Sequence, residues 1–138
     1  MLERDGERRG ADMRCAVLVE QHAAFRQAMA RLLERHLEVE LVEEAATVAE
    51  ARAIALENLK DIDIVVSELS LSDGEATDFL VALREAEADA PVLVLTFRRD
   101  RPSRERALEL GAARVMSKDA PVDEIFAAIR KLGGLGDA

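Results

Sequence analysis

I-V-V-S-E-L-S-L-S-D-G-E, residues Ile64 to Glu75, passes from a short aliphatic run directly into a polar loop. Glu68 stands at the junction, at the point where an apolar strand would end. Burying a carboxylate is costly unless a counter-charge or hydrogen bonds accompany it. We therefore expect Glu68 to belong to an ion pair or a functional site that other parts of the chain help to build.

Four further aliphatic runs resemble the one that leads to Glu68. Their almost continuous apolar character is typical of strands that are covered on both faces, as in a parallel sheet. The predicted strands are Cys15–Val19, Val39–Val42, Ile62–Val66, Val92–Leu95 and Ala113–Met116.

Helical patterns alternate with these runs. Apolar residues from Phe25 to Leu33, and again from Val122 to Ile129, recur at helical spacing and predict one apolar stripe on each helix. Thr47 and Glu50 form a T-x-x-E capping box before an Ala-rich segment. The predicted helices are 25–33, Val48–Leu59, Gly74–Ala86, Pro102–Leu110 and 122–129.

Five strand–helix units in succession predict an α/β fold of the flavodoxin-like (CheY-like) class. Right-handed crossovers would place five helices on both faces of a five-stranded parallel sheet with strand order 2-1-3-4-5. In such sheets ligand chemistry takes place at the carboxyl ends of the strands, beside the switch point between strands 1 and 3. The residues expected there are Glu20, Gln21, Glu68, Thr96 and Lys118.

This set of side chains suits a hard cation and a phosphoryl group. Carboxylate oxygens are ligands that Mg²⁺ accepts. A lysine ammonium and a threonine hydroxyl can donate hydrogen bonds to phosphoryl oxygens.

The composition narrows the function classes. A net charge of −9 argues against direct binding of nucleic acid or of an anionic membrane through a broad basic face. The single cysteine, Cys15, excludes an internal disulfide and a multi-cysteine zinc site. No apolar run is long enough to span a bilayer, and no signal peptide is visible, so we expect a cytoplasmic protein. We expect a disordered lead-in at 1–12, one domain at 13–132, and a Gly-rich tail or linker start at 133–138.

Four motifs resemble the receiver domain of bacterial two-component response regulators, over residues 13 to about 132. V-L-V-E-Q-H-A-A-F-R (17–26) is similar to the family's first strand and helix, and D-I-V-V-S-E-L-S-L-S-D-G (63–74) to its phosphorylation motif. V-L-V-L-T (92–96) matches the strand that ends in the switch residue, and A-L-E-L-G-A-A-R-V-M-S-K-D-A (107–120) the stretch with the conserved lysine. The details H-A-A-F-R and S-K-D-A-P most resemble receivers of the LuxR/NarL-type subfamily.

The chain also departs from the family's pattern. Glu68 stands at the phosphoacceptor aspartate, and the acidic pair corresponds to Glu20 and Gln21, so one metal-binding acid is an amide. Ser72 replaces the proline of the following loop, and Val115 replaces the switch aromatic.

These departures predict a degenerate site, in which Thr96 and Lys118 alone match the family. Glutamate carries its carboxylate about one bond further, and a misplacement of ~1 Å can slow a positioned reaction by about 100-fold. Gln21 weakens the metal remnant formed with Glu20 and Glu68, so we expect no resident cofactor, and a Mg²⁺ site only in weakened form.

We therefore interpret the chain as a pseudo-receiver, not an enzyme, that signals through protein contacts without aspartyl phosphorylation. The resemblance implies a homodimer across the face of helix 4, strand 5 and helix 5, with a histidine kinase or an output domain as further partners. One alternative is a functional phospho-receiver that regulates transcription through a separate output domain. Another is a flavodoxin-like nucleotide- or flavin-binding protein, which the absence of a Gly-rich loop after the first strand disfavours.

Two points stay open at the level of sequence. Glu68 could mimic a phosphorylated state by pairing with Lys118, form an ion pair with a purely structural role, or act as a slow phosphoacceptor. The locally basic run Arg98–Arg106 is either a solvated face or a patch for an acidic protein partner. Asp73 and Glu75 are expected to compensate a helix N-terminus.

Overall fold

The computed structural model describes residues 13–57 and 60–134. The lead-in predicted at 1–12 and the last residues of the predicted tail, 135–138, lie outside this part of the chain. No helix within the described ranges is long and apolar enough to cross a membrane.

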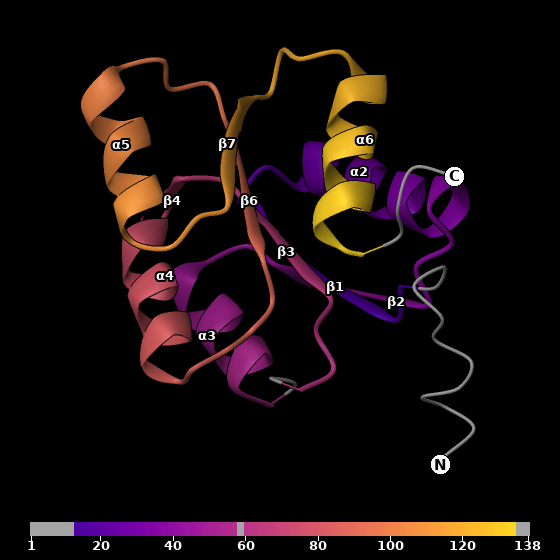
Figure 1. Ribbon diagram of the computed structural model, residues 1–138, viewed down its shortest axis with the longest axis horizontal. Helices are drawn as coiled ribbons and strands as arrows, with labels where there is room; N and C mark the ends of the chain where they lie inside the picture. The colour runs from indigo at the N-terminus through magenta and orange to yellow at the C-terminus, as the bar shows by residue number, and fades with distance from the viewer. Residues whose placement is uncertain (1–12, 58–59, 135–138) are drawn as a thin grey trace.

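A five-stranded parallel sheet forms the centre of the fold, with the order β2-β1-β3-β6-β7 (Figure 1). This is the predicted order 2-1-3-4-5, because the short strands β4 and β5 lie outside the main sheet. The flavodoxin-like class is thereby confirmed. The strands of the sheet are β1 (Cys15–Val19), β2 (Leu41–Ala45), β3 (Ile64–Ser67), β6 (Val92–Thr96) and β7 (Arg114–Ser117).

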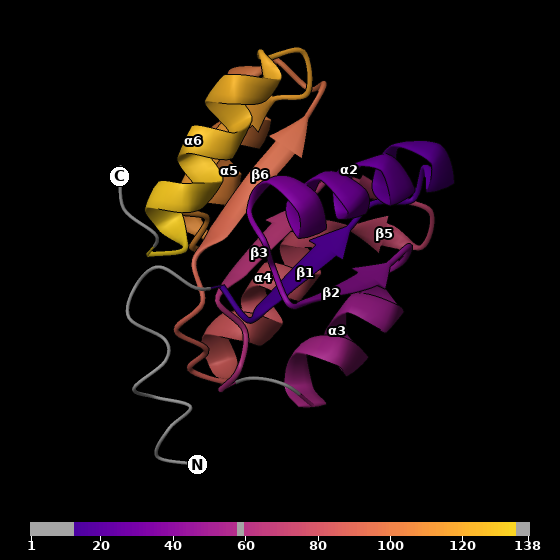
Figure 2. The same cartoon turned by 90° about the vertical axis from the view of Figure 1, so that its right-hand side faces the viewer.

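Five helices in the described chain cover the two faces of the sheet, as expected. Figure 2 shows α2 and α6 together on one face, while α3 and α4 lie on the other, where α5 joins them in Figure 1. Each layer has its own apolar core against the sheet. The helices are α2 (Ala23–His36), α3 (Val48–Glu57), α4 (Ala76–Glu85), α5 (Arg101–Glu109) and α6 (Val122–Leu132).

Strand β1 explains why the apolar runs are continuous. Successive side chains of a strand point to opposite faces. Cys15, Val17 and Val19 therefore pack with the α3–α4–α5 layer, and Ala16 and Leu18 with the α2–α6 layer. All five are buried, so both faces of this strand require apolar residues.

Strand β2 differs from its prediction and lies further along the chain. Glu38 adopts a positive φ of 53° at the end of α2, and the backbone N–H of Val39 still bonds to that helix, at Leu33 O. The strand then runs through Glu43 and Glu44. Because β2 is an edge strand and only partly buried, charges are tolerated in it, and an apolar run is a poor guide to its end.

Two helix predictions also need correction. Val122 is 49% exposed at the first turn of α6, so the apolar stripe of that helix begins at Ile125. Gly74 does not open a helix, because Gly74–Glu75 (β5) pairs with Ser70–Leu71 (β4) in a short antiparallel hairpin. Gly74 has a φ of 147°, which favours glycine, and α4 begins two residues later.

Asp73 compensates a helix N-terminus, as predicted, but the helix is the preceding one. Its carboxylate accepts hydrogen bonds from the backbone N–H groups of Val48 (2.8 Å) and Ala49 (3.1 Å), at the start of α3. These bonds hold the pKa of Asp73 below its usual value. The hairpin that follows β3 is thus tied to the neighbouring helix.

Candidate functional site

Four predicted site residues meet at the carboxyl edge of the sheet, one from the end of each of four strands. Glu20 follows β1, Glu68 follows β3, Thr96 ends β6 and Lys118 follows β7. Backbone bonds hold these ends in register, including Glu68 N to Val19 O (2.9 Å) and Lys118 N to Thr96 O (3.1 Å). We call Glu20, Glu68, Thr96 and Lys118 the Lys118 cluster.

The ammonium group of Lys118 lies between two carboxylates. Its Nζ is 2.5 Å from Glu20 Oε1 and 2.8 Å from Glu68 Oε1. The three side chains are only 4%, 3% and 9% exposed, respectively. Two acids and one base in such a place leave one negative charge, which must be satisfied by hydrogen bonds.

Hydrogen bonds to Glu68 supply that compensation. Its Oε2 accepts from the backbone N–H groups of Leu69 (2.5 Å) and Ser70 (3.3 Å). Burial by itself raises the pKa of the Glu68 carboxyl, but hydrogen bonds from Lys118, Thr96 and Leu69 outweigh it and bring the pKa below its usual value. Glu68 is therefore a charged group with both oxygens engaged by the protein.

Lys118 is stabilised as a cation by the same contacts. Burial lowers the pKa of its ammonium, but hydrogen bonds to Glu20 and Glu68 overcome this and raise the pKa above its usual value. Two aromatic rings flank the ammonium: the ring of Phe25 lies 4.7 Å away and that of Phe97 5.4 Å away. Sequence reasoning missed both rings, although Phe97 directly follows Thr96.

Gln21 is not drawn into the cluster. It is exposed, and the second oxygen of Glu20 instead accepts a hydrogen bond from the backbone N–H of His22 (3.0 Å). The Lys118 ammonium lies between the carboxylates of Glu20 and Glu68, the two acids of the predicted metal remnant. Within residues 13–57 and 60–134, no group of three or more His, Cys, Asp or Glu side chains is placed to hold a metal.

The two predicted switch residues, Thr96 and Val115, lie on neighbouring strands. Thr96 is buried, and its Oγ1 accepts a hydrogen bond from the backbone N–H of Arg98 (3.1 Å). Val115 lies on β7, partly buried against the α3–α4–α5 core, and its carbonyl accepts from Arg104 Nη2 (3.1 Å). The branched side chain of Val115 contributes packing on this side of the sheet.

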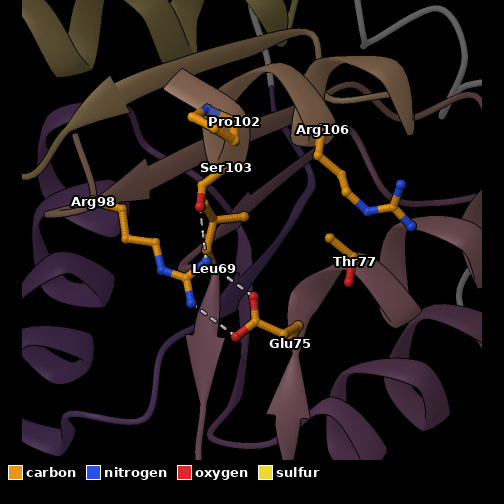
Figure 3. A pocket seen from close by; sticks show the side chains of 7 residues that line it. All are labelled: Leu69, Glu75, Thr77, Arg98, Pro102, Ser103 and Arg106. Carbon is orange, nitrogen blue, oxygen red and sulfur yellow. Dashed lines mark hydrogen bonds and ion pairs between the residues drawn. The ribbon is translucent and has the colours of Figure 1, made fainter. Parts of the chain in front are cut away.

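Arg98 connects the cluster to α5. Its guanidinium donates to both carboxylate oxygens of Glu75 (3.0 and 2.9 Å) and to Ser103 Oγ (3.2 Å), as Figure 3 shows. The loop after β6, the β4–β5 hairpin and the first turn of α5 are thus joined by one side chain. We call Arg98, Glu75 and Ser103 the Arg98 clasp. The sequence placed Arg98 in a basic run but gave no indication of this pairing.

A shallow hollow of about 230 Å³ opens beside the Lys118 cluster. Gln21, His22, Ser70, Phe97 and Arg98 complete its lining. The hollow is the route by which a small molecule would reach Glu68, and the ring of Phe97, 60% exposed, stands at its edge.

Comparisons with known proteins indicate one family. The family model of the response regulator receiver domain matches residues 16–130. The photosynthetic apparatus regulatory protein RegA of Cereibacter sphaeroides is 32% identical over 124 residues, which cover 90% of this chain and 65% of RegA. The nitrate/nitrite response regulator protein NarP of Escherichia coli is 30% identical over 114 residues, which cover 83% of this chain and 52% of NarP.

A solved structure gives the same result. A LuxR-family two-component response regulator from Aurantimonas sp. SI85-9A1 matches with a TM-score of 0.78 and 28% identity, covering 86% of this chain and 84% of that one. This chain spans less than two thirds of the length of RegA and NarP. These matches confirm the resemblance drawn from the sequence and favour it over a nucleotide- or flavin-binding protein. The chain belongs to the response regulator receiver domain family, a family of signalling domains in two-component systems.

Proposed function

We propose that this receiver is atypical and works through protein contacts without aspartyl phosphorylation. The observation that carries the proposal is the position of the Lys118 ammonium, buried between Glu20 and Glu68. Glu68 Oε2 is held by the backbone N–H groups of Leu69 and Ser70, so both oxygens of this carboxylate already have partners within the protein. Phosphoryl transfer depends on the position of the attacking oxygen, and the side chain of Glu68 is one methylene longer than that of the aspartate in the family pattern.

The same arrangement disfavours Mg²⁺. A divalent cation would have to displace an ammonium that has two carboxylate partners and two flanking rings. Mg²⁺ requires oxygen ligands in near-octahedral geometry, and Gln21 offers an amide where the family pattern has a carboxylate. The proposal therefore includes no resident metal, and Glu68 holds a permanent negative charge where a phosphoryl group would otherwise be carried.

Self-association across α5, β7 and α6 is the contact that we propose for signalling. Leu108 on α5 and Val122 on α6 are each 49% exposed and give these two helices apolar surface. Charges of both signs lie on or beside these elements. Arg99 pairs with Asp119, in the loops that precede α5 and α6, and Arg101 pairs with Glu105 on α5. The mixed charge suits an isologous contact, in which each copy presents the same patch.

Partners beyond a second copy follow from the family. Receiver domains interact with histidine kinases and output domains, so the proposal includes both as partners, together with a cytoplasmic location. The alternative to this proposal is a functional phospho-receiver. It is favoured by Thr96 and Lys118, which lie at the strand ends where the family pattern places them.

Thermal unfolding with and without Mg²⁺ tests the metal part of the proposal. At a Mg²⁺ concentration roughly ten times its Kd, a specific site stabilises the folded state by about 1.4 kcal/mol, which raises Tm by roughly 3–7 °C. We expect no such shift in the native chain. The variant Gln21→Asp/Glu68→Asp, which restores both acids of the family pattern, should gain the shift. A Mg²⁺-dependent rise in the native chain would contradict the proposal.

A further inference from the structure

A second hollow, which shares Arg98 with the one beside Glu68, lies between the first turn of α4 and α5. It has a volume of about 270 Å³. Leu69 and Pro102 give it apolar surface, and Thr77 and Ser103 add hydroxyl groups. Figure 3 shows the guanidinium groups of Arg98 and Arg106 on opposite sides of it. We call it the α4–α5 groove.

Arg106 differs from the other arginines of the basic run. Arg98, Arg99, Arg101 and Arg104 each have an intramolecular partner for the guanidinium group. In the described part of the chain, the guanidinium of Arg106 has none. Arg98 pairs with Glu75 and Ser103, and Arg99 pairs with Asp119. Arg101 pairs with Glu105, and Arg104 donates to the carbonyl of Val115.

The charge of this region is opposite to that of the chain. The run 98–106 holds five arginines against two acids, a net charge of +3, while the whole chain carries −9. Arg98 and Glu75 form a bidentate ion pair, so their charges offset each other. The guanidinium left for an external ligand is therefore that of Arg106, a planar group that binds carboxylates in a bidentate manner.

We propose that the α4–α5 groove is a docking site for an acidic segment of a partner protein, with a carboxylate of that segment on Arg106. The exposed side chain of Pro102 would contact the aliphatic part of the bound acidic residue. This surface shares α5 with the face proposed for self-association but uses Arg106 of that helix in place of Leu108. The inference does not depend on the phosphorylation state of Glu68.

Other occupants fit the groove less well. Small-molecule sites enclose most of their ligand, whereas Arg106 and Pro102 are exposed and leave this groove open. Nucleic acid requires several free cations along a backbone, and the described run offers one unpaired guanidinium in a chain of −9. A chain passing over the groove needs only one anchoring carboxylate.

The groove also lies next to the Lys118 cluster. The backbone N–H of Leu69 donates a hydrogen bond to Glu68 Oε2, and the backbone N–H of Arg98 donates one to Thr96 Oγ1. An acidic segment bound to α4 and α5 would thus contact residues bonded directly to the degenerate phosphorylation site.

Random peptides displayed on phage, selected against the full chain, test the proposal. We expect selected peptides rich in Asp and Glu, with amide shifts in NMR at Leu69, Thr77 and Ser103. Losing a charge-assisted bidentate contact should weaken binding about tenfold in Arg106→Gln. Arg101→Gln, which removes an arginine of the same helix whose side chain is 86% exposed, should bind within about twofold of the native chain.

Three results would overturn the inference. They are peptides without acidic enrichment, shifts that map to another surface, and equal affinity for Arg106→Gln and the native chain. Inorganic phosphate at millimolar concentration provides the remaining test: if it alone produced the same shifts, the groove would be a small-anion site and the docking proposal would be wrong.

Discussion

Replacing Lys118 by methionine is the most informative change to the site, because it removes the charge and retains the length of the apolar stem. Glu20 and Glu68 would then face each other with no cation between them, in a place where both are almost fully buried. Removing one partner of a buried ion pair costs about 3–5 kcal/mol, and here two acids lose the same partner. We expect a loss near the upper end of that range at neutral pH, out of the roughly 5–15 kcal/mol typical of a domain.

The cost of Lys118→Met should depend on pH. In the native chain the pKa of Glu68 is lowered, so its stabilisation is present above the unfolded pKa of about 4.3 and is lost as pH falls through the folded pKa. The pKa of Lys118 is raised, so its stabilisation is complete below about pH 10.4 and is lost as pH rises through the folded pKa. In the variant, burial and mutual repulsion raise the pKa of one carboxyl. The folded variant then binds an extra proton at low pH and loses stability as pH rises.

Urea unfolding followed by circular dichroism measures this difference. The destabilisation of Lys118→Met relative to the native chain should be larger at about pH 7.5 than at about pH 5. Lys131→Met is the matched control, since Lys131 is an exposed lysine of α6 and its loss should cost within about 0.5 kcal/mol. A cost for Lys118→Met below about 1 kcal/mol at both pH values would refute the reasoning, because it would mean that water screens the pair.

Two further predictions concern the clasp and the fixed charge. A double-mutant cycle of Arg98→Ala and Glu75→Ala, measured by urea unfolding, should give a coupling free energy of about 0.5–1 kcal/mol, because the contact is bidentate but partly exposed. Additive losses of stability would mean that the clasp is not formed in solution. Glu68→Gln removes the charge without changing the shape of the side chain, and sedimentation equilibrium should show self-association weakened several-fold; an unchanged monomer–dimer equilibrium would leave Glu68 with a structural role alone.

The sequence predicted the main sheet because its three central strands, β1, β3 and β6, are buried on both faces. The strand at Cys15–Val19 was predicted with its observed bounds, since every position in it packs against one helix layer or the other. The predicted bounds of the edge strand β2 were wrong, because an edge strand tolerates charged residues that interrupt the apolar run. The β4–β5 hairpin was missed because two-residue strands carry no periodic pattern, and Gly74 was read as a helix start when its positive φ serves a turn.

The location of the Lys118 cluster could be predicted because parallel strands deliver their ends to one edge. The contacts among its members could not, since they depend on side-chain directions set by the whole fold. The rings of Phe25 and Phe97 reach Lys118 from separate elements, and the sequence gives no pattern that joins them. Arg98 and Glu75 are 23 residues apart and are brought together only by the packing of α5 beside the hairpin.

Beryllofluoride binding, followed by NMR, tests the central claim most directly, because this ion stands in for a phosphoryl group on an acceptor carboxylate. With Mg²⁺ and excess beryllofluoride, the native chain should show no saturable shift of the Thr96 amide signal. The variant Gln21→Asp/Glu68→Asp, which restores the acids of the family pattern, should show a saturable shift of this signal. A saturable Thr96 shift in the native chain would mean that Glu68 accepts the group, and the account of a phosphorylation-independent receiver would be wrong.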